Sequence, residues 1–130
     1  MANYWFDHVH VIGPDPVKTA EFYETCLGAK RGPVGRLPDG SITLDLDLKG
    51  TTIKVRQPRP KALLPNSPLT GLEHFAVQTD DIEKAVDELK AKGVKFLKEI
   101  TESFPGVRAT FFVAPEGVLI ELIERSNPQR

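Results

Sequence analysis

Two stretches of this chain carry one pattern: "FDHVHVIGPDPVKTAEFYETCLGAK" at residues 6–30 and "LEHFAVQTDDIEKAVDELKAKGVKF" at residues 72–96. Aligned without gaps, His8 falls on His74 and Asp15 on Asp81. Each stretch opens with alternating apolar residues, which is typical of a strand, and continues with apolar residues at helical spacing. The recurrence predicts an internal duplication of one structural unit.

The two predicted helices have clear start and stop signals. In the first stretch Asp15 is a natural N-cap, Pro16 suits the first helical position and Gly28 ends the helix. In the second stretch either Asp80 or Asp81 is expected to cap the helix.

Further strands are expected after each helix. They are predicted at residues 41–49 and 51–57, and again at 94–97, 108–114 and 117–124. The basic segment "AKRGPVGR" (29–36) is interpreted as a surface loop. We therefore predict an α+β fold made of two tandem βαβββ modules, each with one sheet face covered by its helix.

One domain is predicted over the whole chain, residues 1–130. Its expected parts are module one at about 4–58, a proline-rich linker at about 58–70, module two at about 71–125 and a polar tail at 126–130.

The composition excludes several classes of protein. Seventeen basic and eighteen acidic residues give a net charge of −1, which argues against a nucleic-acid partner. A single cysteine, Cys26, excludes an internal disulfide and a cysteine zinc cluster, and it is predicted to be a buried hydrophobe. Without a signal peptide or a membrane-length apolar stretch, we expect a cytoplasmic protein with no membrane contact.

Strand alternation sorts the side chains of the repeated strands into two faces. His8, His10 and Ile12 share one face, and Val9 and Val11 the other. In the second repeat Leu72, His74, Ala76 and Gln78 share a face opposite Phe75 and Val77. We expect the valines and Phe75 to pack under the helices, so that the histidines look away from them.

Glu121 interrupts the apolar run of residues 118–123, and a buried carboxylate needs a partner. Glu121 follows Gly117 at the same distance as Lys54 follows Gly50, so the two positions are equivalent in the repeat. His8 with Lys54 therefore matches His74 with Glu121. Two histidines and one carboxylate form a divalent-metal constellation, which predicts a metal ion as the partner of Glu121.

The motifs "DHVHVIGPD…AEFYETCLGAK", "EHFAVQTDDIEKAVDELKAKG" and "APEGVLIELIE" resemble the vicinal oxygen chelate superfamily over about residues 5–125. This superfamily includes glyoxalase I, methylmalonyl-CoA epimerase, extradiol dioxygenases and fosfomycin-resistance enzymes. The resemblance implies a cup-shaped open β-barrel around one divalent ion (Zn, Ni, Co, Mn or Fe). It also implies a homodimer, with the site either within one chain or across two.

Carried over by the resemblance, the metal ligands are His8, His74 and Glu121. At the remaining ligand position, where glyoxalase-like members have Glu or Gln, this chain has Lys54, whose ammonium is repelled by a cation. Three protein ligands leave about three octahedral positions for a small-molecule substrate with two adjacent oxygens.

The catalytic candidates are Glu121, His10 and Lys54. His10, on the face of His8, is the best candidate for a base, with a pocket-wall role as the alternative. Lys54 and Arg56 could bind a substrate carboxylate or phosphate, although Arg56 is more simply interpreted as a solvated strand-end residue. Aromatic residues could line a pocket or fill the core: Trp5, Phe6, Phe104, Phe111 and Phe112.

The leading functional hypothesis is a divalent-metal-dependent lyase or isomerase of the glyoxalase type, acting through a metal-stabilised enolate. The alternatives are an extradiol-type Fe(II) dioxygenase and an antibiotic-resistance protein, either a thiol transferase or a drug binder. The sequence leaves the substrate and the metal open.

Overall fold

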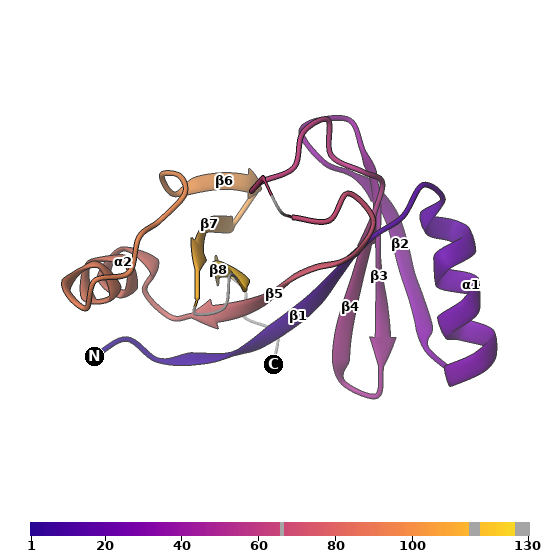
Figure 1. Cartoon of the computed structure of the whole chain (residues 1–130). Helices are drawn as coiled ribbons and strands as arrows, with labels where there is room; N and C mark the ends of the chain where they lie inside the picture. Colours follow the sequence, from indigo (N-terminus) through magenta and orange to yellow (C-terminus); the bar gives the residue numbers. More distant parts are fainter. Residues whose placement is uncertain (66, 115–117, 127–130) are drawn as a thin grey trace. The chain divides into compact units, whose positions relative to one another are not determined.

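The computed structural model describes residues 1–65, 67–114 and 118–126 and contains two helices and eight strands within them (Figure 1). In chain order the elements are β1 (Tyr4–Ile12), α1 (Pro16–Leu27), β2 (Lys30–Arg36), β3 (Ile42–Leu48), β4 (Thr51–Arg56), β5 (Gly71–Thr79), α2 (Ile82–Ala91), β6 (Thr101–Phe104), β7 (Val107–Val113) and β8 (Leu119–Arg125). Gly117 and residues 127–130 of the predicted polar tail lie outside the described residues.

The two repeats have the same strand pairing. In the first, β1 is parallel to β4, β4 is antiparallel to β3, and β3 is antiparallel to β2. In the second, β5 is parallel to β8, β8 is antiparallel to β7, and β7 is antiparallel to β6. The strand orders are therefore β2-β3-β4-β1 and β5-β8-β7-β6. The predicted α+β fold of two βαβββ modules is confirmed.

The parallel pairing repeats residue by residue as well. His10 lies opposite Lys54 in β1–β4, and Ala76 lies opposite Glu121 in β5–β8. Because His10 aligns with Ala76 in the sequence repeat, Lys54 and Glu121 occupy the same position in their repeats. The equivalence expected from glycine spacing is confirmed by strand register.

Both helices begin where the capping signals place them. The Asp15 side chain accepts a hydrogen bond from the backbone N–H of Lys18, Pro16 is the first residue of α1, and Gly28 follows in the left-handed conformation that glycine favours. Asp81, rather than Asp80, caps α2.

Strand β2 corrects one sequence interpretation. The segment predicted as a basic surface loop forms β2 against β3, at the outer end of its strand order. This strand was not predicted because it contains Gly32, Pro33 and Gly35, and glycine and proline are rare in strands. Within a sheet, proline is tolerated only at edges and bulges. The pairing register indeed shifts between Arg31 and Val34, on either side of Pro33.

The expected strand at 94–97 is also wrong. In that segment Phe96 makes an isolated bridge with Phe112, and the strand that pairs with β7 is β6, further along the chain. Apolar alternation over four residues does not distinguish a strand from a segment that buries one side chain. Here that side chain is the partly buried Phe96 ring, which packs edge-on against Phe112.

Each helix covers one face of its own sheet. Ala20 and Tyr23 of α1 pack with an apolar layer from β1, β3 and β4: Val11, Leu44, Leu46, Ile53 and Val55. Ile82, Ala85 and Val86 of α2 pack with Leu122 and Phe112. Cys26, expected to be buried, is exposed on α1 and corrects that prediction. The opposite face of the N-terminal sheet carries His8, His10 and Lys54. The opposite face of the C-terminal sheet carries His74 and Glu121 beside an apolar cluster of Ala76, Ala109 and Ile123.

The chain divides into two compact units whose boundaries differ from those of the repeats. The N-terminal unit is His8–Glu73, and the C-terminal unit combines Met1–Asp7 with His74–Arg130. The first residues of the chain are held by the C-terminal unit. The Ala2 amide donates to Glu88 at 2.7 Å, the Asn3 side chain donates to Asp80 at 2.8 Å, and Phe6 stacks on Phe75.

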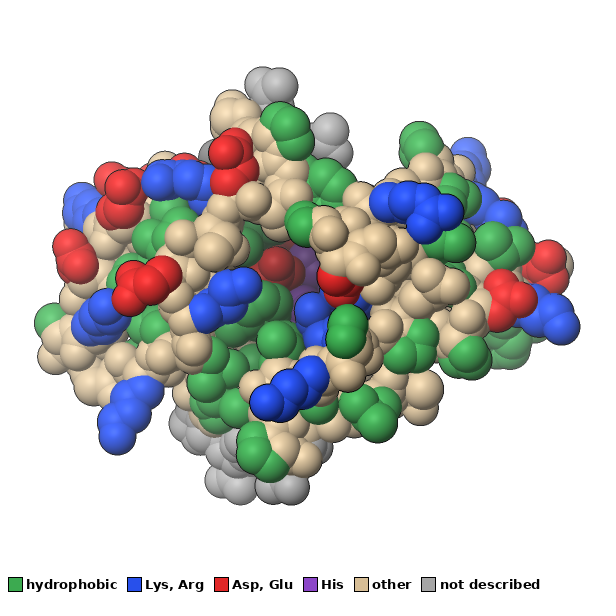
Figure 2. All heavy atoms as spheres, turned by 90° about the horizontal axis from the view of Figure 1, so that it is seen from above, with side chains coloured by type: hydrophobic (Ala, Val, Ile, Leu, Met, Phe, Trp, Pro, Cys, Tyr) green, Lys and Arg blue, Asp and Glu red, His purple; other side chains and the backbone are tan. Residues whose placement is uncertain are grey.

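Charged side chains of both signs are interspersed over the face seen in Figure 2, in line with the balanced composition. Among the described residues, no helix combines the length and the apolar character needed to cross a bilayer.

Arg56, expected at a solvated strand end, is buried and corrects that interpretation. Its guanidinium donates to the Asp39 carboxylate at 2.6 Å, the Ser41 hydroxyl at 3.0 Å and the Gln57 carbonyl at 2.9 Å. Burial alone would raise the pKa of Asp39, but hydrogen bonds from Ser41 and Arg56 outweigh it and lower the pKa to about 2. The guanidinium therefore holds the turn between β2 and β3 and is engaged by the protein itself.

We expect Asp39→Asn to lower the free energy of unfolding by about 1.5–3 kcal/mol at pH 7, because it removes a charged acceptor from a buried guanidinium. The folded pKa of Asp39 lies below its ordinary value of 3.8, so this contribution is complete above about pH 4 and disappears as the pH falls through 2. Urea unfolding at pH 7 and pH 3 measures both effects. Asp87→Asn on the exposed side of α2 is the control, and an equal loss in the two variants would contradict the assignment.

Candidate metal centre

The sheet face of the N-terminal unit that points away from α1 is polar. Cross-strand neighbours place His10, Lys54 and Asp45 in one row across β1, β4 and β3. His8 and Thr52 form the adjacent row. Leu44, Leu46 and Val55, on the other face, belong to the core beneath α1. Alternation along three adjacent strands therefore separates an apolar face from a face able to bind polar ligands.

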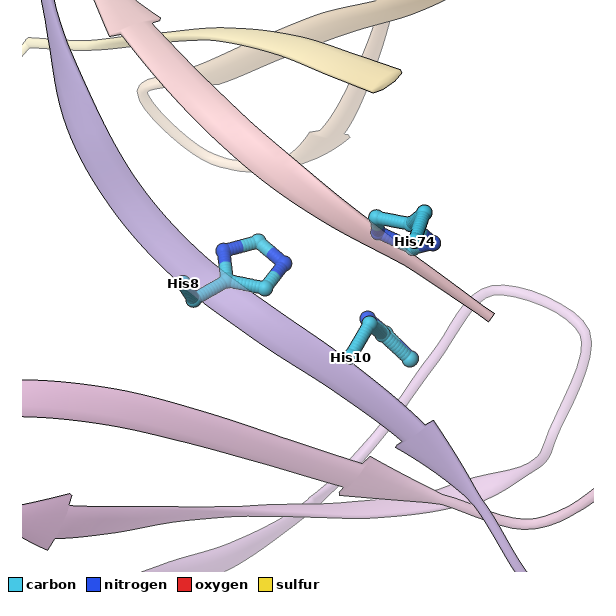
Figure 3. A group of neighbouring side chains, drawn as sticks. All are labelled: His8, His10 and His74. Atoms are coloured by element: carbon cyan, nitrogen blue, oxygen red, sulfur yellow. The ribbon is translucent and has the colours of Figure 1, made fainter. Parts of the chain in front are cut away.

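His8 and His10 project from the same side of β1, as the sequence predicts (Figure 3). Both imidazoles are buried, and their ring centroids lie 5.6 Å apart. His74, on β5, is the third histidine of the chain and is buried as well. Each of the three offers a ring nitrogen that could bind a divalent ion.

His74 and Glu121 meet within the C-terminal unit. The His74 Nε2 atom lies 3.2 Å from Glu121 Oε1, and the two side chains are only 1% and 14% exposed. The carboxylate in the apolar strand β8 thus has an imidazole partner. The parallel register places Glu121 opposite Ala76, two residues from His74 on the same face.

This spacing fits two ligands of one metal ion. Donor atoms at about 2.0–2.2 Å from an ion, in adjacent octahedral positions, are separated by about 3 Å. The observed separation of 3.2 Å matches that value, and imidazole nitrogen and carboxylate oxygen suit the borderline divalent metals. The two residues of the second repeat therefore fit the group that the sequence predicts.

Phe111 supports the His74 ring from the neighbouring strand. The two rings pack edge to face with centroids 5.2 Å apart, and Phe111 lies opposite Glu121 in the β7–β8 register. Of the other candidate aromatic residues, Phe112 belongs to the core under α2, whereas Phe6 and Phe104 are exposed. Phe111 is thus an aromatic residue that contacts a candidate ligand.

Lys54 is held by a carboxylate of its own repeat. Its Nζ atom lies 2.9 and 3.0 Å from the two oxygens of Asp45, on the next strand. Asp45 lies opposite Lys54 in β3–β4, and Phe111 lies opposite Glu121 in β7–β8. Asp45 and Phe111 therefore occupy equivalent positions in the two repeats. Asp45 was not expected at the site, although its alternation in "LDLDL" places it on the polar face.

Gln78 is a further polar residue on the His74 face whose environment the sequence does not reveal. Its side chain is fully buried, and neither amide atom has a hydrogen-bond partner among the described residues. Ile123 is its neighbour in β8, and Ala109 lies beyond Ile123 in β7. A buried amide between apolar side chains is costly unless a ligand or a water molecule satisfies it.

The chain belongs to the Glyoxalase/Bleomycin resistance protein/Dioxygenase superfamily, whose family model matches residues 5–122. This is the superfamily that the sequence motifs resemble. The histidines, Lys54 and Glu121 all lie within the matched range.

The chain is also similar to individual proteins and to solved structures. The chain is 33% identical to the uncharacterised protein YwkD of Bacillus subtilis, over 91% of this chain and 94% of that protein. It is 30% identical to mitochondrial methylmalonyl-CoA epimerase of Mus musculus, over 89% of this chain and 70% of that protein. The crystal structure of methylmalonyl-CoA epimerase from Mycobacterium tuberculosis has the same fold, with a TM-score of 0.78 and 24% identity over 94% of this chain and 88% of that one.

Replacing Gln78 with methionine, which has nearly the same shape, is expected to raise the free energy of unfolding by about 1 kcal/mol. The substitution removes a buried amide that has no partner among the described residues. Urea unfolding of the metal-free protein measures the change. A loss of stability would contradict this expectation.

Proposed function

We propose that this protein is a divalent-metal-dependent isomerase that moves a proton on the carbon next to a carbonyl in a small acyl substrate. The observation that carries the proposal is the contact between His74, which is buried, and Glu121, which is partly buried; the two have the spacing of neighbouring metal ligands. Membership of the superfamily and isomerase-type relatives support it.

The proposed ligands are His8, His74 and Glu121. His8 is buried and occupies in the first repeat the position that His74 occupies in the second. Zn, Ni, Co, Mn or Fe would suit this donor set. The lysine at the position equivalent to Glu121 is not proposed as a ligand, because its Nζ atom is in an ion pair with Asp45.

The metal would supply Lewis-acid stabilisation to the substrate oxygen that gains negative charge when the proton leaves. His10 is proposed as the proton acceptor. Its ring is buried on the face of His8, and a neutral imidazole removes a proton efficiently near pH 7. Glu121 would be a candidate base only if it were not holding the ion.

Lys54 is proposed to bind an anionic group of the substrate. The relatives named methylmalonyl-CoA epimerase indicate an acyl thioester, and methylmalonyl-CoA carries a carboxylate and a thioester carbonyl on one carbon. Such a substrate has the two nearby oxygens that the resemblance implies, and its carboxylate suits an ammonium. The predicted homodimer and cytoplasmic location remain predictions.

Metal binding and proton exchange test this proposal together. We expect protein purified without added metal to contain a divalent ion, and protein reloaded with cobalt or manganese to exchange the C2 proton of methylmalonyl-CoA in D2O. His74→Ala and Glu121→Gln should lose both properties, and His10→Gln only the exchange. Elemental analysis and mass spectrometry provide the readouts.

Glu124→Gln is the matched control, because Glu124 also lies on β8 but accepts hydrogen bonds from Arg108 and the Ile82 amide. It should keep the metal. An ion that stays bound in both His74→Ala and Glu121→Gln would refute the proposed ligands. Iron-dependent oxygen consumption without proton exchange would favour the dioxygenase class instead.

Lys54 stands at the position equivalent to the proposed ligand Glu121, and its charge leads to a second prediction. Lys54→Gln should raise cobalt affinity about five- to tenfold, because removing a positive charge near a dication recovers about 1 kcal/mol or more. The same variant should raise KM for methylmalonyl-CoA. Isothermal titration and initial rates measure the two effects, with Lys95→Gln, an exposed lysine of the second repeat, as the control. Unchanged cobalt affinity would place Lys54 away from the ion.

A further inference from the structure

Each of the two proposed histidine ligands, His8 and His74, is preceded by an acid that an arginine holds in a two-bond ion pair. Asp7 precedes His8, and the Arg125 Nε and Nη2 atoms donate to its two oxygens at 3.1 and 3.0 Å. Glu73 precedes His74, and the Arg59 Nε and Nη2 atoms donate to its two oxygens at 2.7 Å each. We call these two ion pairs the arginine clamps.

The clamps are buried more deeply than an ordinary surface ion pair. The Glu73 and Asp7 side chains are 1% and 5% exposed, whereas the Glu24 side chain, which Arg31 binds through two nitrogens on the surface, is 29% exposed. A two-bond arginine–carboxylate pair fixes orientation as well as distance, and solvent screens a buried pair weakly. Loss of one member leaves a buried charge without its partner.

The clamps also cross between the two repeats. Asp7 lies on the first strand of the first repeat, but its arginine ends β8 of the second repeat. Glu73 lies on the first strand of the second repeat, and its arginine follows β4 of the first. Arg125 comes four residues after Glu121, and Arg59 comes five residues after Lys54, so the exchange is nearly symmetric.

The unit boundaries fall between each clamped acid and its histidine. Asp7 ends one segment of the C-terminal unit and His8 begins the N-terminal unit, whereas Glu73 ends the N-terminal unit and His74 resumes the other. Strands β1 and β5 therefore pass from one unit into the next at the bond before the histidine. Because adjacent residues on a strand point to opposite faces, the arginine binds the acid on one face while the histidine projects from the other.

From this arrangement we propose that the arginine clamps are positioning devices for the metal centre. They fix the backbone of β1 and β5 immediately before His8 and His74, and so set the direction in which each imidazole is presented. Asp7, Glu73, Arg59 and Arg125 act through the histidines and bind no metal themselves. This inference rests on the proposed function, since it assumes that both histidines hold one ion.

Cobalt binding to the full-length protein tests the inference. Asp7→Asn, Glu73→Gln and the charge-retaining Arg59→Lys and Arg125→Lys are compared with the unsubstituted protein by competition titration. We expect cobalt affinity to fall about tenfold or more in each variant, as occurs when groups that orient metal ligands are removed. The visible spectrum of bound cobalt should change, because it reports the geometry of the ligands. The lysine variants guard against misfolding, because they keep the charge and lose only the two-bond geometry.

Glu24→Gln is the matched control, because it removes a two-bond arginine pair remote from the histidines in sequence. It should leave the cobalt spectrum and affinity unchanged. The charge-swapped double variant with Glu73→Arg and Arg59→Glu should recover part of the affinity lost in Glu73→Gln. Thermal unfolding of each metal-free variant separates a loss of fold from a loss of ligand geometry.

The outcomes distinguish the two proposals. If the unsubstituted protein binds no cobalt, the metal centre is refuted and this inference with it. If it binds cobalt, and the clamp variants keep its affinity and spectrum while only their unfolding temperature falls, the clamps are structural and this inference alone is overturned.

Discussion

The parallel pairing of the first and last strand in each repeat is the constraint on which the site depends. In β1–β4 and in β5–β8 the last strand runs beside the strand that carries the histidine, in the same register. Because side chains alternate across a strand, this register brings the side chain at the Lys54 or Glu121 position onto the face of the histidine. A slip of one residue would move Glu121 to the side of α2 and separate it from His74.

Duplication of this unit produced two related but chemically different faces. The second repeat places an acid, Glu121, next to His74, and the Phe111 ring packs against the His74 ring. The first repeat has Lys54 at the position of Glu121, and an acid, Asp45, at the position of Phe111. One repeat therefore offers the two proposed metal ligands His74 and Glu121 with an apolar support, whereas the other offers a histidine beside an ion pair. This asymmetry is the reason for proposing that the second repeat supplies more of the metal ligands and that Lys54 of the first repeat binds an anionic substrate group.

Much of the architecture could be predicted from local signals. Asp15, Asp81 and Gly28 mark helix boundaries through backbone hydrogen bonds and conformation that involve only a few neighbouring residues. The segment predicted as a loop became β2 because an edge strand needs only half of its backbone groups paired, so glycine and proline are tolerated there. The environment of Arg56 could not be predicted, because its partners Asp39 and Ser41 lie 17 and 15 positions away and reach it through the turn between β2 and β3.

The sequence by itself determined the repeat, the alternation of faces and the candidate ligands, because these follow from residue spacing and the two-residue period of a strand. Only the tertiary structure decided which groups meet. Glu121 and His74 are separated by 47 positions, and Asp7 and Arg125 by 118, so their contacts depend on strand register and on the division of the fold into units. The burial of Gln78 and the exposure of Cys26 were decided there too, since burial depends on what packs over a residue and not on the residue itself.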